Sequence, residues 1–510
     1  MNRPSNIDTN GTEGIAGVDI ASTPRRRVVV IGGGLSGLAA AHRLVTRAEA
    51  LRLPIEVVLV EAKDRVGGVI WADRRDGFTF ENGPDSFITN KPWAADLCRE
   101  IGLGDQLIAT DERHRRSFVV REGRLHPVPD GFVLMAPSKI GPLLTTPILS
   151  FRGKLRMLLD LVRPRKRDDS DESLASFVKR RLGREALDRL VQPLVGGIYT
   201  ADPNELSLAA AAPQFPAMER EHGSLIRAAV RNARRARADE KNASGARYGL
   251  FMSLLDGMDT LPKTLARKLP RGSIRLRTAV RRLTRDDASG RWRVELLDGP
   301  PLEADGVIVA CEAHAAARLL DGHDPTLALH LRSIPYASSA IVNVGFDRYR
   351  VAHPLDGFGL VVPAIEKRGI LAVSFLSVKF PMRAPSGQVA MRVFVGGATQ
   401  PELFDLDDAE MKRLVLGELA SLLGARGEPT YIEIGRHPRA MPQYTLGHLD
   451  RVGVIRRHVA KHRGLGLAGI AFDGVGIPDC IRAARESADA ILALVSQPSA
   501  QVDERVTPLR

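Results

Sequence analysis

A glycine-rich turn between a hydrophobic run and a helical run is the first feature of this chain that points to chemistry. Residues 28–37 read Val-Val-Val-Ile-Gly-Gly-Gly-Leu-Ser-Gly. Gly32 allows a sharp turn off a strand, Gly34 leaves room for a pyrophosphate beside the backbone, and Gly37 allows a helix to pack closely. Because a helix start presents free N–H groups and partial positive charge, this run predicts the phosphate-binding turn of a dinucleotide site.

A second hydrophobic run ends on an acid at the spacing that such a site requires. Residues 55–60 read Ile-Glu-Val-Val-Leu-Val, and Glu61 follows them, 24 residues after Gly37. A carboxylate at the end of the second strand accepts hydrogen bonds from ribose hydroxyls. The same negative charge disfavours a 2′-phosphate, so NADP is not expected.

The chain contains a second match to the same glycine spacing, which we do not expect to bind a cofactor. Residues 464–469 read Gly-Leu-Gly-Leu-Ala-Gly, but they follow Lys-His-Arg instead of a strand. No acid-terminated strand follows them at the right distance. The setting, and not the spacing alone, makes the fingerprint specific.

The second strand continues into a run that favours FAD over NAD. Residues 61–68 read Glu-Ala-Lys-Asp-Arg-Val-Gly-Gly. Gly67 and Gly68 would bring the backbone close to a longer ligand, with Arg65 as a cation near its phosphates. The alternative is an ordinary glycine turn with a surface arginine. Since no second phosphate-binding unit for a nicotinamide follows, we expect FAD as the sole cofactor and no metal.

Size and composition limit the class of protein. The chain has 510 residues, of which 44% are hydrophobic, enough for two or three domains with a large core. Its three cysteines, Cys98, Cys311 and Cys480, are far apart, which excludes a disulfide framework or a cysteine-based metal site and fits the cytoplasm. Residues 1–24 are expected to form a disordered tail, and no apolar stretch is long enough to span a membrane.

The formal net charge of +13 suggests an anionic partner. Nucleic acid is not expected, because no nucleic-acid-binding motif accompanies the charge. Segments 151–163 and 224–238 read as basic amphipathic helices that would suit an anionic membrane surface such as the inner face of the cell membrane. The alternative for both is a solvated helix face over a core. Their pattern leaves both interpretations open.

The rest of the chain alternates between helical and strand patterns. Segment 173–189 reads as helix and 239–249 as a linker. Strands are expected at 274–277, 292–296, 306–310, 340–346, 359–362, 371–377 and 391–395, the last four as an antiparallel sheet. Near the end, a glycine-rich run, residues 465–477, leads into a helix at 481–494. If this unit lies beside the first turn, residues 474–477 would cover a flavin ring.

Taken together, these motifs resemble the oxygen-dependent protoporphyrinogen oxidase family, called coproporphyrinogen III oxidase in some bacteria, within the FAD-dependent amine oxidase superfamily. The more specific matches are Gln192-Pro-Leu-Val-Gly-Gly-Ile-Tyr199, Met441-Pro-Gln-Tyr444 with Gly447-His448, and Gly474-Val-Gly-Ile-Pro-Asp-Cys480. The resemblance runs from about residue 27 to 495. The family often has Trp where His437 stands, which leaves the role of His437 open.

The resemblance implies an α/β fold with an FAD-binding Rossmann-like domain assembled from separated segments. A mixed or antiparallel-sheet substrate domain and a helical insertion like a membrane-binding domain complete it. The expected parts are FAD-binding stretches at 25–112, 248–318 and 446–495, a helical substrate and membrane-binding-like region at 113–238, a sheet domain at 319–445 and a tail at 496–510. Cofactor contacts are expected from Gly32, Gly33, Gly34, Leu35, Ser36, Gly37, Glu61, Ala62, Arg65, Gly67, Gly68, Val69, Gly83, Pro84, Asp85, Ser86, Val280, Val475, Gly476 and Ile477.

The activity implied by the resemblance is oxidation of a porphyrinogen to the porphyrin in haem biosynthesis, with O2 as acceptor and release of hydrogen peroxide. Arg115 or Arg116 is the implied holder of a substrate carboxylate, since a guanidinium binds carboxylate in a bidentate manner. No side chain is assigned as a general base; Tyr444 and His448 fit a structural role better than a catalytic one. A ferrochelatase contact is a further expectation, and the oligomeric state stays open.

Two other interpretations remain. One is an FAD oxidase for an amine or a polyene, although aromatic residues are only 5% of the chain, which does not favour an aromatic cage around an amine. The other is a non-catalytic flavin-binding partner of a haem-pathway enzyme. Sequence alone does not separate coproporphyrinogen III from protoporphyrinogen IX as substrate.

Overall fold

The computed structural model describes residues 25–168, 170–242, 251–286 and 288–497. The expected N-terminal tail lies outside these residues, and so do all but the first two residues of the expected C-terminal tail. Of the expected linker at 239–249, residues 239–242 belong to helix α10 (Leu225–Asn242), and the rest lies outside the described residues.

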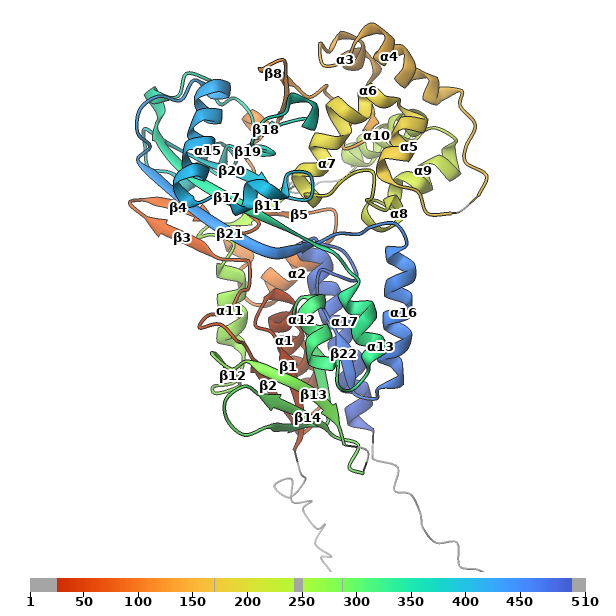
Figure 1. The fold of residues 1–510 in the computed structure, drawn as a ribbon, viewed down its shortest axis with the longest axis vertical. Coiled ribbons are helices and arrows are strands. Elements are labelled where there is room, and N and C mark those ends of the chain that lie inside the picture. Colours follow the sequence, from red (N-terminus) through yellow and green to blue (C-terminus); the bar gives the residue numbers. More distant parts are fainter. Residues whose placement is uncertain (1–24, 169, 243–250, 287, 498–510) are drawn as a thin grey trace, which may run out of the picture.

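A five-stranded parallel sheet forms the centre of the lower lobe in Figure 1. Its order is β12 (Ile274–Arg275), β2 (Ile55–Val60), β1 (Arg26–Ile31), β16 (Gly306–Val309) and β22 (Leu465–Leu467). These strands come from three distant stretches of the chain, which confirms that the Rossmann-like domain is assembled from separated segments. Strand order reverses at β1, the point where α/β sheets of this type bind their ligands.

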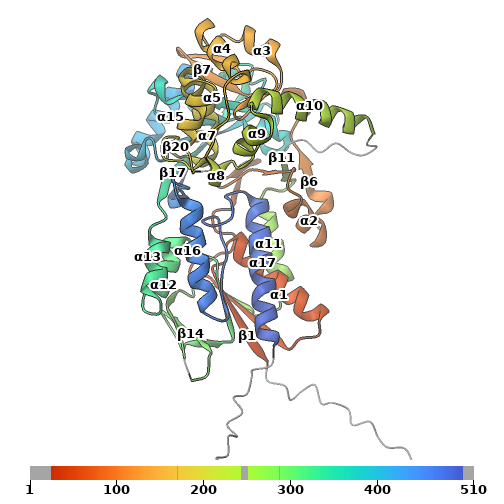
Figure 2. The ribbon, with the colours of Figure 1, turned by 90° about the vertical axis from the view of Figure 1, so that its right-hand side faces the viewer.

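Alternate residues of β1 face two different cores. Val28 and Val30 pack with α1 (Leu35–Ala50), α11 (Thr260–Lys268) and α17 (Ile477–Ser496). Val29 and Ile31 pack with the ribbon β13 (Val280–Arg285), β14 (Trp292–Leu296) and β15 (Leu302–Ala304), and with α12 (Ala313–Leu320), α13 (Pro325–Arg332) and α16 (His448–Lys461). Figure 2 shows α12 and α13 on one side of this lobe and α1 on the other. Burial on both faces explains the unbroken Val-Val-Val-Ile run.

A seven-stranded sheet occupies the upper left of Figure 1. Its order is β21 (Tyr431–Pro442), β17 (Tyr336–Asp347), β20 (Gln388–Gly396), β19 (Ala372–Ser374), β18 (Gly359–Val361), β7 (Phe118–Arg121) and β8 (Arg124–Pro127). Only β18 and β7 pair in parallel. The helix α15 (Asp408–Leu423) covers one face. The expected antiparallel sheet is therefore present, but its expected strand at 371–377 ends at Ser374, where α14 (Leu376–Lys379) soon follows.

A helical region occupies the upper right of Figure 1. It comprises α3 (Ile140–Thr145), α4 (Phe151–Leu158), α5 (Leu174–Arg181), α6 (Arg184–Ala186), α7 (Gln192–Tyr199), α8 (Leu208–Ala211), α9 (Gln214–His222) and α10. Two expected helices are shorter than predicted. The one at 151–163 changes to a 3-10 turn after Leu158, and the one at 173–189 breaks at Gly183, whose φ is 98°.

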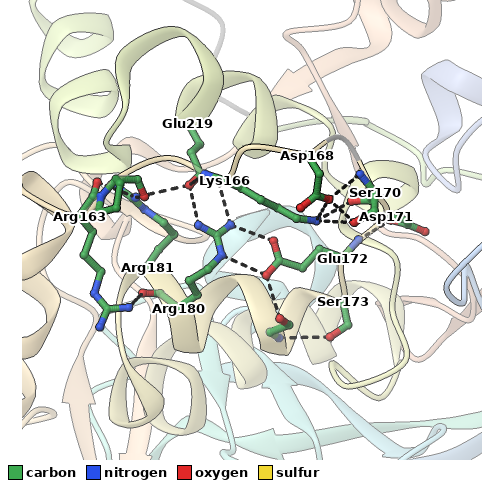
Figure 3. A network of polar contacts seen from close by, with 12 residues as sticks. Arg163, Lys166, Asp168, Ser170, Asp171, Glu172, Ser173, Arg180, Arg181 and Glu219 are labelled. Atoms are coloured by element: carbon green, nitrogen blue, oxygen red, sulfur yellow. Dashed lines mark hydrogen bonds and ion pairs between the residues drawn. The ribbon is translucent and has the colours of Figure 1, made fainter.

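Buried and partly buried ion pairs hold this region together, and Figure 3 shows the contacts of Arg180 and Arg181 with Glu219. Arg180 bridges Glu172 and Glu219, with nitrogen–oxygen distances of 2.8 and 2.6 Å. Arg181, fully buried, pairs with the fully buried Asp160. These contacts fix the segment between α4 and α5 against α9. Removing one partner of such a pair is strongly destabilising, because it leaves an uncompensated buried charge.

Asp171 extends this arrangement toward the lower lobe. One carboxylate oxygen accepts a hydrogen bond from the Ser207 hydroxyl at 2.8 Å, and the other accepts one from the backbone N–H of Gly447 at 3.0 Å. Gly447 is the N-cap of α16. The helical region is thus joined to the helix that packs on the parallel sheet.

Smaller elements complete the described fold. They are β3 (Ala72–Arg75), β4 (Phe78–Glu81), β5 (Phe87–Ile88), α2 (Trp93–Glu100), β6 (Leu107–Ala109), β9 (Phe132–Val133), β10 (Ala136–Pro137) and β11 (Phe251–Leu254). Among the described helices, none has the length and apolarity needed to cross a lipid bilayer. All three cysteines are free thiols.

Candidate functional site

The predicted glycine turn lies at the carboxyl end of β1, where the strand order reverses. Gly32 has φ of 109°, and a Cβ there would lie 2.7 Å from the carbonyl oxygen of Ala310. A Cβ on Gly37 would lie 1.8 Å from the carbonyl oxygen of Gly32. By contrast, a Cβ on Gly34 would meet no atom within 4 Å. The turn therefore needs Gly32 and Gly37 for packing, and it leaves open space above Gly34.

Gly34 is also the N-cap of α1, and the first turn of this helix contains no acidic residue. The free N–H groups of the first turn carry partial positive charge. Open space beside uncapped N–H groups suits an anion such as a pyrophosphate. The start of α1 thus offers space and donors for a phosphate, and the binding of one there stays a prediction.

Glu61 lies directly beside this turn. Its Oε2 accepts a hydrogen bond from the backbone N–H of Gly33 at 2.6 Å, and its Oε1 accepts one from the N–H of Lys63 at 2.8 Å. The backbone of the following segment is tied to residues near β13, since the N–H of Thr278 donates to the carbonyl oxygen of Glu61 at 2.8 Å. This contact brings Val280, at the start of β13, into the neighbourhood of Glu61.

The second glycine pair packs on the first. The N–H of Gly67 donates to the carbonyl oxygen of Gly33 at 2.8 Å, and Gly34 and Gly67 form a parallel bridge. A Cβ on Gly68 would lie 3.2 Å from the Cα of Gly34. The two glycine runs therefore form one continuous backbone surface. The guanidinium of Arg65 lies over the ring of Trp71, 5.4 Å from its centroid.

The segment of residues 83–86 lies against the residues that follow the second glycine pair. A Cβ on Gly83 would lie 2.0 Å from the carbonyl oxygen of Val69, so only glycine fits there. Val69 itself is 41% exposed. The structure thus brings the predicted contacts Val69 and Gly83 together at the same edge.

Two cations from the seven-stranded sheet domain hold Asp85 in this segment. Lys379 Nζ lies 2.8 Å and Arg392 Nη1 lies 3.1 Å from Asp85 Oδ2. Arg392 also donates to the carbonyl oxygen of Gly83. Burial alone would raise the pKa of Asp85, but the charges of Lys379 and Arg392 outweigh it and hold the pKa well below its usual range. Asp85 therefore anchors the segment as a carboxylate.

The C-terminal glycine run lies beside the first glycine turn, which meets the condition set in the sequence analysis. Ser36, at the start of α1, shares a hydrogen bond with Cys480, at the start of α17. Gly476 is the N-cap of α17, and a Cβ on Gly474 would lie 2.9 Å from the carboxylate carbon of Asp479. The starts of α1 and α17 therefore lie side by side, with Val475, Gly476 and Ile477 near the open space above Gly34, which we call the glycine crevice.

Lys91 fixes the start of α17 from the loop before α2. Its Nζ lies 2.7 Å from Oδ1 and 2.6 Å from Oδ2 of Asp479. Neither Lys91 nor the pair Lys379–Arg392 was singled out from the sequence. A single lysine in a loop has no motif around it, and the partners of these cations lie hundreds of residues away. The sequence contains no local signal for such contacts.

Tyr444 holds the loop before α17. Its hydroxyl donates to the carbonyl oxygen of Ile470 and accepts from the N–H of Gly474 at 3.0 Å. The ring of His448 stacks on it, with centroids 4.1 Å apart, and burial lowers the pKa of His448 to about 4. A neutral buried histidine stacked on a hydrogen-bonded tyrosine agrees with the structural role expected for both.

His437 lies on β21, opposite Ser339 of β17. Burial lowers the pKa of His437, so the ring is neutral near pH 7. Its environment includes the backbone of Asn82, the residue before Gly83, with which it forms a hydrogen bond. His437 thus faces the segment that carries predicted cofactor contacts.

Arg115 and Arg116 lie outside the glycine crevice. Both are exposed, in the loop before β7. Arg116 Nη1 lies 3.3 Å from Oδ2 of Asp356, and its carbonyl oxygen accepts from the N–H of Phe358. The structure places the two arginines at the edge of the sheet domain, and their role as carboxylate ligands stays a prediction.

The second glycine match, residues 464–469, forms no phosphate-binding turn. Leu465–Leu467 is the edge strand β22, and Gly466 pairs with Ile308 within the sheet. A Cβ on Gly466 would lie 2.6 Å from the Ser487 hydroxyl oxygen. Gly466 therefore allows close packing of α17 on the sheet.

The crevice has the groups that a dinucleotide requires. The N–H groups at the start of α1, the open space above Gly34 and the Glu61 carboxylate provide the donors and the acceptor that a pyrophosphate and a ribose require. Within the described residues, no group of three or more His, Cys, Asp or Glu side chains is placed to hold a metal ion.

Comparison with known proteins identifies relatives along nearly the whole chain. Residues 35–492 match the family of flavin-containing amine oxidoreductases. The coproporphyrinogen III oxidase of Bacillus subtilis is 34% identical over 93% of this chain and 100% of its own length. The coproporphyrinogen III oxidase of Propionibacterium freudenreichii is 38% identical over 93% of this chain and 92% of its own length.

A solved structure has the same fold. It is a protein of Exiguobacterium sp. 255-15, named as a candidate protoporphyrinogen oxidase, with a TM-score of 0.81 and 32% identity. The match covers 92% of this chain and 100% of that one. The arrangement of the two lobes described above is therefore shared with a protein of known structure.

Proposed function

The chain belongs to the flavin-containing amine oxidoreductase family, and from this we propose that it is an FAD-dependent, oxygen-dependent oxidase that converts a porphyrinogen to the porphyrin in haem biosynthesis. The similarity over 93% of the chain to proteins named coproporphyrinogen III oxidase is the observation that carries this proposal. It favours coproporphyrinogen III as the first substrate to test, with protoporphyrinogen IX as the second.

The crevice supports FAD in particular. An adenosine diphosphate moiety needs an anion site and a ribose acceptor, which the start of α1 and Glu61 provide. FMN lacks the second phosphate and the adenosine, and would leave Glu61 without a ribose to bind. We propose cofactor contacts from residues 32–37, 61, 62, 65, 67–69, 83–86 and 475–477, and from Val280.

The substrate surface that we propose is one face of the seven-stranded sheet. One row of cross-strand neighbours crosses four strands of this sheet. It runs from Val361 of β18 through Ala372 of β19 and Phe394 of β20 to Ile341 of β17. Residues that stand opposite one another on neighbouring strands share a face. An apolar row of this kind suits the flat hydrophobic body of a tetrapyrrole. Arg115 and Arg116 remain the proposed ligands of its carboxylates.

In this reaction, the chain's own residues hold in place the segments that we propose to contact the cofactor. Lys91 and Asp479 hold the start of α17, Tyr444 holds the loop before it, and Lys379 and Arg392 hold the segment of residues 83–86. Bound FAD would supply the redox chemistry, accepting a hydride from the substrate and passing the electrons to O2 to give peroxide. No side chain is required as a nucleophile.

Reconstitution tests the proposal. Protein saturated with FAD is mixed with coproporphyrinogen III or protoporphyrinogen IX in air, and porphyrin fluorescence, O2 uptake and peroxide are followed. We expect fluorescence to rise and O2 uptake to keep pace with it. Spermine and amino acids serve as comparison substrates. Peroxide formation with an amine and none with either porphyrinogen would reject the proposal, as would binding without turnover.

The carboxylate ligands are tested separately. Replacing Arg115 or Arg116 by Gln should raise KM for coproporphyrinogen III about tenfold at little change in kcat, if a charge-assisted hydrogen bond is lost. Arg281, exposed on β13 of the other lobe, offers a control of equal charge change. A KM that stays within twofold of wild type in both variants would remove these arginines from the substrate site.

Attachment to an anionic membrane is proposed for the helical region. Phe151 is 80% and Val162 is 76% exposed, and both lie among basic residues of segment 151–163. Exposed apolar side chains beside cations are typical of interfacial helices. Sedimentation with vesicles, with and without anionic lipid, tests it: Phe151→Ser should reduce the sedimenting fraction, and equal sedimentation of the variant and wild type would contradict it.

A further inference from the structure

A basic pocket lies at the edge of the seven-stranded sheet, remote from the glycine crevice. It has a volume of about 470 Å³ and is lined by Arg121, Glu122, Arg124, His126 and Pro147. The first four come from the hairpin of β7 and the edge strand β8, and Pro147 lies between α3 and α4. Figure 1 shows β8 and α3 as neighbours at the top of the molecule. None of these residues was assigned to the cofactor or the substrate.

The register of the hairpin brings its three basic side chains to one face. Arg121 stands opposite Arg124, and His126 stands opposite Val119. Because successive side chains of a strand alternate between faces, Arg121 and Val119 share a face, and so do Arg124 and His126. Directly opposite residues have Cβ atoms about 5 Å apart. The two guanidinium groups and the imidazole therefore gather on one surface.

The hairpin is held rigidly at both ends. Val119 is fully buried in the core of the helical region. At the tip, the carboxylate of Glu366 accepts from the N–H of Glu122 at 2.9 Å and from the N–H of Gly123 at 3.3 Å. A fixed backbone keeps the basic side chains together in the absence of any ligand. The pocket is therefore preorganised, which lowers the cost of binding.

The positive charges of the pocket have little compensation. Arg124 and His126 take part in no ion pair between the residues that the structure describes. Arg121 Nε lies 3.2 Å from Oε1 of Glu122, but the Glu122 side chain is 76% exposed, so water screens this pair. Burial, followed by the charge of Arg121, lowers the pKa of His126; Glu122 opposes this shift and Arg124 adds to it. Because the positive charges of this pocket repel one another, a bound anion would stabilise them.

We propose that this pocket binds a phosphate group, either of a free phosphate monoester or of a phospholipid headgroup. Guanidinium groups bind phosphate oxygens in a bidentate manner, and a protonated imidazole adds a third donor. The neighbouring surface allows both sources. Leu144 and Phe151, which flank Pro147 along the chain, are 49% and 80% exposed, so a lipid chain would find apolar contacts beside the pocket. The proposal does not depend on the proposed oxidase activity.

The first test uses inorganic phosphate and the imidazole of His126. Histidine resonances of the FAD-loaded full chain are followed by NMR across pH, with and without phosphate, and His126 is assigned with His126→Gln. Phosphate should raise the pKa of His126 by about half a unit, because an anion favours the charged imidazole. Sulfate and chloride are compared at the same ionic strength. An effect of sulfate that chloride lacks indicates an oxyanion site and not charge screening. An unchanged pKa of His126 at saturating phosphate would overturn the proposal.

Variants of the pocket sharpen this test. Arg124→Gln should weaken phosphate binding about tenfold, the effect of losing a charge-assisted hydrogen bond. Arg281→Gln, which removes an exposed arginine from the other lobe, should leave it unchanged. Glu122→Gln should tighten binding severalfold, because it removes the one carboxylate that lines the pocket. Equal effects of R124Q and R281Q would show a general charge effect and reject a specific site.

Vesicles distinguish the two sources. Phosphatidylcholine vesicles with and without phosphatidic acid, whose headgroup is a phosphate monoester, are sedimented with wild type, R124Q and R281Q. If R124Q alone loses binding to phosphatidic acid, the site binds a headgroup. If all three sediment equally while R124Q still loses inorganic phosphate, the site binds a free phosphate. If R124Q still binds both phosphatidic acid and inorganic phosphate as wild type does, the proposal is refuted.

Discussion

The carboxylate of Glu61 accepts a hydrogen bond from the backbone N–H of Gly33 at 2.6 Å. The two residues lie at the ends of neighbouring parallel strands, β1 and β2, and the contact joins the acid to the glycine turn. A second N–H, from Lys63, fixes the other oxygen. Since a carboxylate accepts about four hydrogen bonds, Glu61 keeps capacity for ribose hydroxyls while its orientation is already set.

Glu61→Gln should weaken FAD binding about tenfold or more. An amide accepts through one oxygen only, so its NH₂ group would face either the N–H of Gly33 or that of Lys63. Hydrogen bonds to a charged acceptor are worth about 1.5–3 kcal/mol each. Titration of the apoprotein with FAD, followed by flavin fluorescence, gives the dissociation constant. A dissociation constant equal to that of wild type would show that Glu61 does not contact the cofactor.

Gly34→Val should abolish FAD binding while leaving the fold intact. Gly34 has φ of −69°, which any residue adopts, and a Cβ there meets no protein atom within 4 Å. The valine side chain would instead occupy the space proposed for the pyrophosphate. We expect a melting temperature of the apoprotein close to that of wild type, and a colourless protein after purification. A yellow G34V protein would reject this location for the phosphates.

Gly417→Ala is the matched control for that variant. Gly417 lies exposed within α15, and a Cβ there also meets no atom within 4 Å. Replacing an exposed helical glycine by alanine stabilises a protein by about 0.5–1 kcal/mol. FAD affinity should not change. Loss of FAD in G417A would mean that the effect of G34V arises from folding and not from the pyrophosphate site.

The sequence predicted those parts of the site whose signal is local. Gly32, Gly37 and Glu61 lie within one strand–turn–helix–strand unit, and each has a reason for its identity that the spacing reveals. The C-terminal run carried a local signal for a glycine turn before a helix, but its place beside α1 was only a condition in the sequence analysis, and the contact of Ser36 with Cys480 meets that condition. Glycines are informative because only a close approach or a positive φ requires them.

The sequence did not predict the residues that act across long distances. Asp85 is held by Lys379 and Arg392, nearly 300 or more residues further along the chain, and no spacing rule connects them. The prediction of a helix that continues to residue 189 is wrong for a related reason. Gly183 packs on the side chain of Arg156, a tertiary contact that overrides the helical pattern around it. The boundaries proposed for the domains stay predictions.

Stability should fall as pH rises from about 4.5 to 7 because of Glu81. Burial raises the pKa of Glu81 to about 7 in the folded protein, although the charge of Arg383, 3.3 Å away, opposes this. Between the two pKa values the folded chain holds a proton that the unfolded chain releases, so the free energy of unfolding decreases with pH. The free energy of unfolding decreases by about 3 kcal/mol in all, and the decrease is complete above the pKa that Glu81 has in the folded protein.

Glu81→Gln isolates this contribution. Glutamine retains an oxygen to accept the N–H of Met258, which donates to Glu81 at 3.0 Å, but it does not titrate. The difference in unfolding free energy between wild type and E81Q, from urea denaturation at several pH values, should therefore shift in favour of E81Q as pH rises from 4.5 to 8. A difference that is constant over this range would show that Glu81 keeps an ordinary pKa in the folded protein.

Tyr444→Phe should loosen the FAD-binding loop. The hydroxyl of Tyr444 joins the carbonyl oxygen of Ile470 to the N–H of Gly474, and the loop between them leads to the residues proposed to cover the flavin. Without the hydroxyl, two buried backbone groups lose their partner, which costs about 1–3 kcal/mol for each group left unsatisfied. We expect both a lower melting temperature and faster dissociation of FAD.

Tyr431→Phe separates the loop's role from general destabilisation. Tyr431 is also buried, and its hydroxyl donates to the carboxylate of Asp73, but it lies at the far end of β21 from Tyr444. Both variants should lower the melting temperature of the apoprotein. Only Y444F should speed FAD release, measured as recovery of flavin fluorescence after dilution. Since both lose one buried hydroxyl, equal rates of release would assign the effect to stability, and the loop would then have no part in retaining the cofactor.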